Sequence, residues 1–271
     1  MACRRQFSWA PQRRPRHAGA RPSMRRHILT ADPYQHLPTL RGQLTPPEQS
    51  ELRVTPQVLA AWDERARRRG QPDTWRLSDD ELERARRAFL EGLDLTEDLW
   101  VYAYGSLMWN PGFHFAEVRR AEVQGYQRRF TYKTTMGRGS PLRPGLMLAL
   151  EPNGGSCQGL AFRIGAGLAD PESAVLWRRE MIRGSYHPCL LPVGTPQGEV
   201  RALAFTSKVG HPSLVGELPL AQTVSWIASG VGELGTNRDY LAQLAGQLEH
   251  LGIEDAYIAQ LHERVCAVVG A

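Results

Sequence analysis

Short runs of aromatic and β-branched residues constrain the fold of this 271-residue chain more than any other feature. The runs cover residues 99–104, 121–132, 146–150, 159–164, 189–193 and 200–206, and glycine, proline or asparagine separates most of them. Runs of this kind, bounded by turn-forming residues, are typical of β-strands. Helices are expected beside these strands but do not alternate strictly with them, so the sequence predicts an α+β fold.

Helix signals flank the strands. Ser78 and Glu81 form a capping box that opens a helix ending near residue 90. Asp170, followed by a proline, predicts the N-cap of a second helix that runs to about Arg183 and stops at Gly184. Further helices are expected over residues 221–229, after a cap at Thr236 as far as residue 251, and over 254–269.

Charge divides the chain unevenly. Residues 1–31 contain eight arginines and no acidic residue, and subtracting them from the formal net charge of +5 leaves −3 for the rest. We interpret 1–31 as an arginine-rich disordered leader, dispensable or translated from a start upstream of the true one at Met24, with a nucleic-acid-binding tail as the alternative. Residues 32–97 are expected to form an N-terminal helical preface, and residues 98–271 the main domain.

Several classes of protein are disfavoured. No apolar run approaches the ~18 residues of a membrane-spanning helix. Cys3, Cys157, Cys189 and Cys266 lack the spacing of a zinc or dithiol site, and the histidines show no paired spacing. We therefore expect no metal, no cofactor, no membrane partner and no nucleic-acid partner for the main domain. Four scattered cysteines fit a reducing, cytoplasmic location.

One glycine pattern imitates a dinucleotide-binding loop. Gly230, Gly232 and Gly235 match GxGxxG, and Asp255 follows at a suitable distance. That motif requires a preceding strand and a helix that opens within it. The segment before it is expected to be helical, and the next helix starts after the last glycine. We therefore interpret these residues as a loop.

Glu180 is the first candidate for chemistry. On a helical wheel it falls inside an arc formed by Leu176, Trp177 and Met181. A carboxylate among apolar side chains loses hydration, which raises its pKa and suits it to act as a base near neutral pH. The alternative is a structural ion pair with Arg179, Arg183 or another arginine.

The second candidate is the end of the first strand, at Tyr104, Gly105 and Ser106. Glycine permits tight backbone turns, and consecutive amide groups in such a turn can surround an anion. The Ser106 hydroxyl adds a donor or acceptor. The alternative is an ordinary turn after a strand.

Four segments together resemble the ChaC family of γ-glutamylcyclotransferases. They occur in the order of the family and cover roughly residues 98–251, and the likeness is greatest to bacterial members with an N-terminal helical preface. The segments are WVYAYGSLMWNP at 100–111, VQGYQRRF at 123–130, LWRREMIRGSY at 176–186 and GVGELGTNRDYL at 230–241.

The resemblance implies a compact mixed β-barrel flanked by helices, with residues 98–271 as the γ-glutamylcyclotransferase domain. It implies that glutathione is the substrate and that it is cleaved to 5-oxoproline and Cys-Gly without metal or cofactor. The family's catalytic glutamate falls on Glu180. Its substrate-binding loop falls on Val101, Tyr102, Ala103, Tyr104, Gly105, Ser106 and Leu107, with Ala103 where many members have glycine.

Weaker candidates for shaping the pocket are Tyr126, Arg128, Tyr186 and Tyr240. Either Arg128 or Arg129 is a candidate partner for the glycine carboxylate of glutathione. Two alternatives stay open: a cyclotransferase for other γ-glutamyl amino acids or amines, and an inactive binding protein with a basic tail. The oligomeric state has no signal in the sequence.

Overall fold

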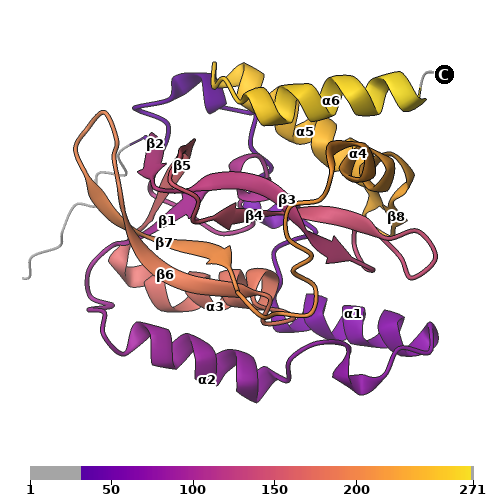
Figure 1. Cartoon of the computed structure of the whole chain (residues 1–271). Helices are drawn as coiled ribbons and strands as arrows, with labels where there is room; N and C mark the ends of the chain where they lie inside the picture. Colours follow the sequence, from indigo (N-terminus) through magenta and orange to yellow (C-terminus); the bar gives the residue numbers. More distant parts are fainter. Residues whose placement is uncertain (1–31, 270–271) are drawn as a thin grey trace, which may run out of the picture. The chain divides into compact units, whose positions relative to one another are not determined.

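The computed structural model describes residues 32–269, and its main sheet lies between two groups of helices (Figure 1). Its five strands are arranged in the order β2-β5-β1-β7-β6. The β1–β7 pair is parallel and the other neighbours are antiparallel, so the α+β prediction is confirmed. The bounds are β1 (Leu99–Ala103), β2 (Glu117–Gln124), β5 (Ser156–Ile164), β6 (Tyr186–Val193) and β7 (Val200–Ser207).

Two hairpins accompany this sheet: β3 (Gln127–Thr134) with β4 (Gly145–Glu151), and the short β8 (Val231–Gly232) with β9 (Gly235–Thr236). The single strand expected over 121–132 is wrong, because Gly125 and Tyr126 separate β2 from β3. Gly125 has a φ of +83°, in the left-handed region that glycine adopts without steric cost. The turn directs β3 away from β2 and onto β4.

The edges of the five-stranded sheet meet at a single bridge. Glu122 of β2 and Gly194, just beyond β6, exchange two backbone hydrogen bonds of 2.9 Å each. No ladder of paired strands extends from this bridge in the described residues, and β2 and β6 remain the edges of the sheet.

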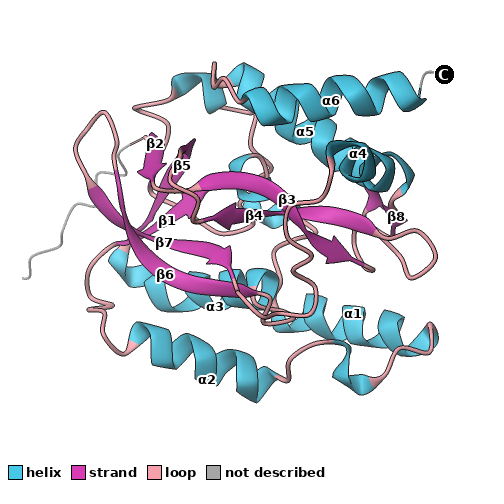
Figure 2. Ribbon diagram, in the orientation of Figure 1, coloured by secondary structure: helices cyan, strands magenta, loops and turns pink. Residues whose placement is uncertain are grey.

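The helices form two groups (Figure 2). On one side α4 (Leu220–Ser229), α5 (Asn237–His250) and α6 (Ala256–Val269) pack against one another. On the other lie α1 (Pro56–Arg68), α2 (Asp79–Leu90) and α3 (Ala169–Glu180), with α2 packed on α3. The sequence predicts all of these except α1. Five short 3-10 helices lie in the connections, at Pro38–Leu40, Pro47–Gln49, Asp73–Trp75, Ser106–Met108 and Ala166–Leu168.

The predicted capping box at Ser78 and the predicted cap at Thr236 are both present. The Ser78 hydroxyl accepts from the Glu81 amide and the Glu81 carboxylate accepts from the Ser78 amide, which opens α2. Thr236 and Asp239 make the same reciprocal pair at the start of α5. These bonds satisfy amide groups that have no partner inside a helix.

The predicted ends of α3 are wrong at both termini. The helix continues from a 3-10 turn, so its N-cap is Leu168 without a side-chain cap, and Asp170 instead accepts from Arg86 of α2 at 2.8 Å. The helix ends at Glu180, three residues earlier than predicted. Gly184, with a φ of +62°, then closes a turn in the left-handed region. Glu180 therefore stands at the end of the helix rather than within it.

Residues from the preface fix α3 in place. Arg53 makes two hydrogen bonds, of 2.6 and 2.9 Å, with Glu172, whose side chain is only 3% exposed. At the other end of the helix, the Leu77 amide donates to the Ile182 carbonyl at 2.9 Å. The first turn and the segment after the last turn are thus both bound by residues outside the main domain.

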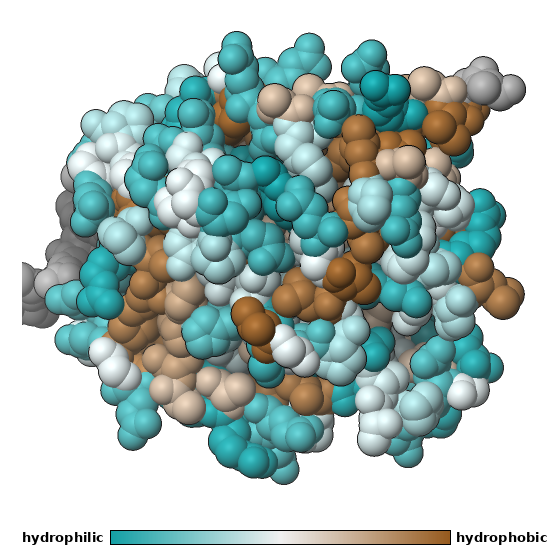
Figure 3. Space-filling view, viewed as in Figure 1, coloured by the Kyte–Doolittle hydropathy of each residue, from teal (hydrophilic) through white to brown (hydrophobic). Residues whose placement is uncertain are grey.

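The inner face of α3 belongs to the hydrophobic core. Trp177 is buried, and its ring lies 5.7 Å from that of Phe205 in β7. The surface in Figure 3 is mostly hydrophilic, with hydrophobic residues in small separate groups. Between residues 32 and 269, none of the helices has the length and apolar character needed to span a membrane.

The buried Arg53–Glu172 pair gives a test of how firmly the preface holds α3. Substituting Arg53→Met removes the guanidinium and leaves the buried Glu172 carboxylate with the His114 amide as donor, at 3.1 Å, and we expect the free energy of unfolding to fall by about 3 kcal/mol. The double variant Arg53→Met/Glu172→Gln removes both charges and should recover most of that loss. Urea denaturation of both variants measures the difference, and equal losses in the two would contradict this role for the pair.

Candidate active site

The end of α3 places a carboxylate in a largely apolar setting. Leu176 and Trp177 of the last turns are buried, and the Glu180 side chain is only 16% exposed. Burial raises the pKa of the Glu180 carboxyl, because the charged form loses hydration, while the positive charge of Arg179 partly opposes this shift. The group is thus a stronger proton acceptor than a solvated glutamate.

Arg179 connects this carboxylate to the end of β1. Its Nε lies 3.1 Å from Glu180 Oε1, and its Nη2 donates to Ser106 Oγ at 2.9 Å. Its Nη1 donates to the carbonyls of Asn110 and Pro111 at 2.6 and 3.1 Å. The guanidinium is only 7% exposed, and burial lowers the pKa of Arg179. The ion pair that the sequence offered as an alternative exists, and it coexists with a raised pKa at Glu180.

The predicted loop divides into two parts. Val101, Tyr102 and Ala103 belong to β1 and are fully buried, and the Tyr102 hydroxyl donates to the Cys157 carbonyl at 2.6 Å. Tyr104 is also fixed, because its hydroxyl donates to the Phe205 carbonyl at 2.8 Å. These residues hold the strand in the sheet, so the part that can meet a ligand begins at the next residue.

Gly105, Ser106 and Leu107 form that second part. Ser106 and Leu107 open a 3-10 helix, where the first amides lack partners inside the helix. Gly105 has a φ of −138°, so a left-handed turn is not the reason for glycine here. A Cβ at this position would lie 3.2 Å from the Tyr240 hydroxyl and 3.4 Å from a Leu148 methyl. Close approach to Tyr240 is the structural requirement.

Two of the predicted tyrosines gather around Glu180. Burial, and then the negative charge of Glu180, raise the pKa of both Tyr186 and Tyr240, which keeps the phenols neutral. The Tyr186 hydroxyl donates to the Leu148 carbonyl at 2.8 Å. Tyr126 is not part of this group: it lies in the β2–β3 turn, where burial and the Cys189 thiol raise its pKa.

Arg128, a candidate partner for the glycine carboxylate, is buried in the interior of the domain. It is 2% exposed, and it donates to the Tyr104 carbonyl at 2.7 Å and pairs with Asp255 at 2.9 Å. Its other amino group donates to the Gln158 carbonyl. With these partners it holds the strand end rather than offering a free cation. Arg129 stacks on Tyr257 at 4.5 Å, so neither arginine is poised for a substrate carboxylate.

The glycine pattern at 230–235 forms the β8–β9 hairpin before α5, in agreement with its interpretation as a loop. The next residue of note is Asn237, which is fully buried. Its side-chain amide exchanges two hydrogen bonds of 2.7 Å with the backbone of Leu146 in β4. Asn237 therefore ties the start of α5, and with it Tyr240, to the β3–β4 hairpin.

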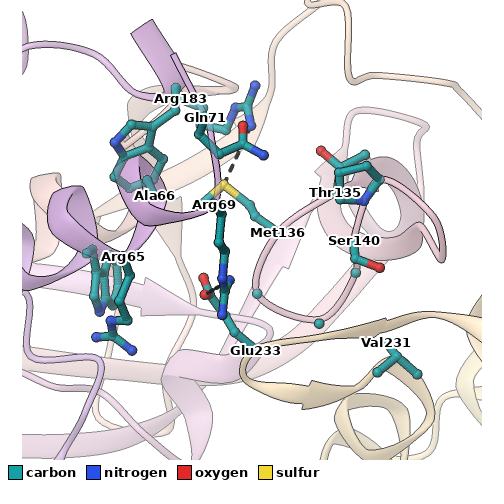
Figure 4. A pocket seen from close by; sticks show the side chains of 16 residues that line it. Arg65, Ala66, Arg69, Gln71, Thr135, Met136, Ser140, Arg183, Val231 and Glu233 are labelled. Carbon is teal, nitrogen blue, oxygen red and sulfur yellow. Dashed lines mark hydrogen bonds and ion pairs between the residues drawn. The ribbon is translucent and has the colours of Figure 1, made fainter. Parts of the chain in front are cut away.

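A cavity of about 490 Å³ lies between the preface and the main domain (Figure 4). One wall comes from α1 and the turn after it, and the opposite wall from the β3–β4 loop and the β8–β9 hairpin. Arg183, three residues after Glu180, lies on its lining. The sequence gives no signal for this cavity, because its walls lie far apart along the chain. Within residues 32–269 no cluster of three metal-ligating side chains is found.

The match to a known protein family covers most of the main domain expected over residues 98–271. A model of the ChaC-like protein family matches residues 99–268, which is more than half of the chain. This chain belongs to the ChaC-like family. Its ChaC-like region contains β1, α3 and α5, and so all the residues described around Glu180. The preface lies outside the match.

Named relatives of this ChaC-like protein are enzymes. The chain is 37% identical over 158 residues to the glutathione-specific γ-glutamylcyclotransferase of Escherichia coli, covering 58% of this chain and 68% of the relative. It is 30% identical over 173 residues to the human glutathione-specific γ-glutamylcyclotransferase 1, covering 62% and 78%. A crystal structure of the yeast γ-glutamyl cyclotransferase specific to glutathione has the same fold, with a TM-score of 0.58, 22% identity, and coverage of 63% of this chain and 96% of the yeast chain.

The contact between Gly105 and Tyr240 gives a test of the site's packing. Gly105→Ala inserts a methyl group against the Tyr240 hydroxyl, and we expect a loss of about 1–2 kcal/mol in the free energy of unfolding. Gly167→Ala is the matched control, because a Cβ there would meet nothing within 4 Å. Thermal unfolding compares the two, and equal stability would show that the approach of Gly105 to Tyr240 does not constrain the site.

Proposed function

We propose that this chain degrades glutathione by intramolecular cyclisation of its γ-glutamyl group, releasing 5-oxoproline and Cys-Gly, with no metal or cofactor. The observation that carries the proposal is the buried Glu180 carboxylate with its raised pKa, joined through Arg179 to Ser106. Membership in the ChaC-like family and the names of the relatives support glutathione as the substrate.

In the proposed reaction Glu180 acts first as a base and then as an acid. Its carboxylate takes a proton from the α-ammonium group of the substrate, and the resulting amine attacks the γ-carbonyl carbon. The new C–N bond closes the five-membered ring, and the bond from that carbon to the cysteine nitrogen breaks. The attacking nitrogen gives up a second proton as the ring forms, and Glu180 passes both protons in turn to the departing nitrogen, which leaves as the ammonium group of Cys-Gly, so the protein ends unchanged. Because attack is intramolecular, holding the substrate in a folded conformer lowers much of the barrier.

The loop at Gly105–Leu107 is proposed to bind the negative charge of the substrate. The Ser106 amide faces the Tyr240 hydroxyl, whereas the Leu107 amide, at the start of a 3-10 helix, can donate to the α-carboxylate or to the oxyanion that forms on the γ-carbonyl. Ser106 Oγ already accepts a hydrogen bond from Arg179, so its own hydrogen is free to point to the substrate. Arg179 would thus position both the base and the loop.

Tyr186 and Tyr240 are proposed as walls that keep this chemistry away from water. Their raised pKa values keep them uncharged beside Glu180, so they do not compete as proton acceptors. Val101, Tyr102, Ala103 and Tyr104 are proposed to act by holding β1 in register rather than by touching substrate.

The proposal also covers the barrel, the division of the chain and the cellular location. We propose that the five-stranded sheet and the β3–β4 hairpin act as one compact mixed barrel, supported by the Glu122–Gly194 bridge and the packing of β4 on β7. The proposed division is a leader over 1–31, a preface over 32–97 and the γ-glutamylcyclotransferase domain over 98–271. A cytoplasmic location is supported by Cys157, Cys189 and Cys266, which are free thiols.

The direct test is product analysis with a base-deficient variant. We expect the wild type to convert glutathione to equal amounts of 5-oxoproline and Cys-Gly. Glu180→Gln keeps the shape of the side chain but accepts no proton, so turnover should fall by at least about 10³-fold with the fold intact. Chromatography quantifies both products, and circular dichroism checks the fold. Full activity of the variant would exclude Glu180 as the base.

Parallel assays define the substrate class. γ-Glutamyl-alanine and γ-glutamyl-lysine contain the same reacting group as glutathione and differ only beyond it. Turnover of glutathione well above that of both supports the proposal. A preference for either of the others would make this chain a cyclotransferase for γ-glutamyl amino acids or amines instead.

A further inference from the structure

The cavity that Arg183 lines has a surface suited to one end of an anionic peptide. Three arginines and one glutamate contribute to it, giving a net lining charge of +2. Arg69 is neutralised by Glu233, which faces it across the cavity (Figure 4). The remaining positive charge comes from Arg65 on α1 and from Arg183. Apolar surface is supplied by Trp62, Trp75, Met136 and Val231.

Of the three arginines that line the cavity, Arg183 is the nearest to Glu180 in the sequence. It sits in the turn that follows α3, where the Gly184 amide donates to the Met181 carbonyl at 2.8 Å. It lies three positions after Glu180, so their Cα atoms are at most about 11 Å apart. The Arg183 side chain is exposed, and within residues 32–269 no carboxylate lies within ion-pair distance of it; its Nη1 lies 3.6 Å from the Met136 sulfur.

The β3–β4 loop provides a second link between the cavity and the site. Gly137 and Gly139 of this loop line the cavity, and Arg138 between them adds positive charge near Tyr240. Tyr240 in turn lies against Gly105. Two segments therefore connect the cavity lining to the group around Glu180: the turn after α3, which carries Arg183, and the β3–β4 loop, which carries Arg138.

We propose that this cavity receives the Cys-Gly half of the substrate and that Arg183 binds its terminal carboxylate. The inference rests on the proposed function. Two peptide units, or about 7 Å, separate the γ-carbonyl carbon of glutathione from its glycine end, which is less than the upper bound of about 11 Å on the separation of the Glu180 and Arg183 Cα atoms. The cavity volume of about 490 Å³ falls in the range of small-molecule sites. Arg183 takes the role that Arg128 and Arg129 cannot fill.

The preface gains a function from this assignment. Trp62, Arg65, Ala66, Arg69, Gln71 and Trp75 form one wall of the subsite, and all of them lie outside the region that matches the ChaC-like family. The reacting end of the substrate would be held by the family's own residues, and the departing end would be enclosed partly by the preface.

The test removes each partner of the proposed carboxylate–arginine contact in turn. The substrates are glutathione and its C-terminal amide, in which the glycine carboxylate is replaced by a neutral carboxamide. The proteins are the wild type, Arg183→Gln, Arg183→Lys and Arg68→Gln. Arg68 is a matched control because it is exposed on α1, pairs with Glu64 and lies off the cavity.

The expected results distinguish loss of the Arg183–carboxylate contact from a loss of activity that affects both substrates equally. Wild type should prefer glutathione over the amide by about 10-fold in kcat/KM, mainly through KM. Arg183→Gln should lose that preference, with glutathione reduced about 10-fold and the amide unchanged. Arg183→Lys should keep most of the preference, and Arg68→Gln should behave as wild type.

Two other results have different meanings. If the wild type forms 5-oxoproline but Arg183→Gln retains the preference, or loses both substrates equally, the subsite assignment is wrong and the proposed function stands. If the folded wild type forms no 5-oxoproline from glutathione, both the proposed function and the subsite are overturned.

Discussion

The Arg179–Glu180 pair is the interaction on which the rest of the site depends. A carboxylate in an apolar pocket is costly unless it has a partner, and a partner that is too strong would make it a weak base. Arg179 divides its guanidinium among Glu180, Ser106 and two backbone carbonyls, so it supports the carboxylate while the raised pKa persists. The same side chain joins the end of α3 to the end of β1.

Correct placement of the Arg179–Glu180 pair requires α3 to be fixed along its length. Contacts from the preface hold both ends of this helix. Arg53 binds the first half of the helix through Glu172, and the Leu77 backbone binds the segment after its end. Arg128 fixes the end of β1 in a similar way, because it donates to the Tyr104 carbonyl and pairs with Asp255. Buried arginines thus set the two elements that meet at the site, and bidentate or multiple hydrogen bonds suit arginine to this use.

The sequence predicts the local features well and the tertiary ones poorly. The apolar surroundings of Glu180 on its helix and the Ser78 and Thr236 caps follow from spacing alone, because these depend on residues a few positions apart. The Asp170 cap failed because Arg86, distant in the chain, takes that carboxylate. Arg128 is a candidate for the substrate carboxylate in the sequence because nothing there places Asp255 beside it. The cavity has no local signal, since α1 and the β3–β4 loop meet only in the folded chain.

The most direct test of the account is the pH dependence of kcat/KM for 5-oxoproline formation from glutathione. Glu180 accepts a proton only as the carboxylate, so activity should fall as the pH drops through its raised pKa, above the ordinary value of 4.5. Arg179→Gln removes a positive charge that lowers this pKa, so its acid limb should lie at higher pH, while Arg178→Gln, which changes the adjacent arginine, should match the wild type. An acid limb at or below 4.5, or one that moves to lower pH in Arg179→Gln, would contradict the assignment of Glu180 as the base.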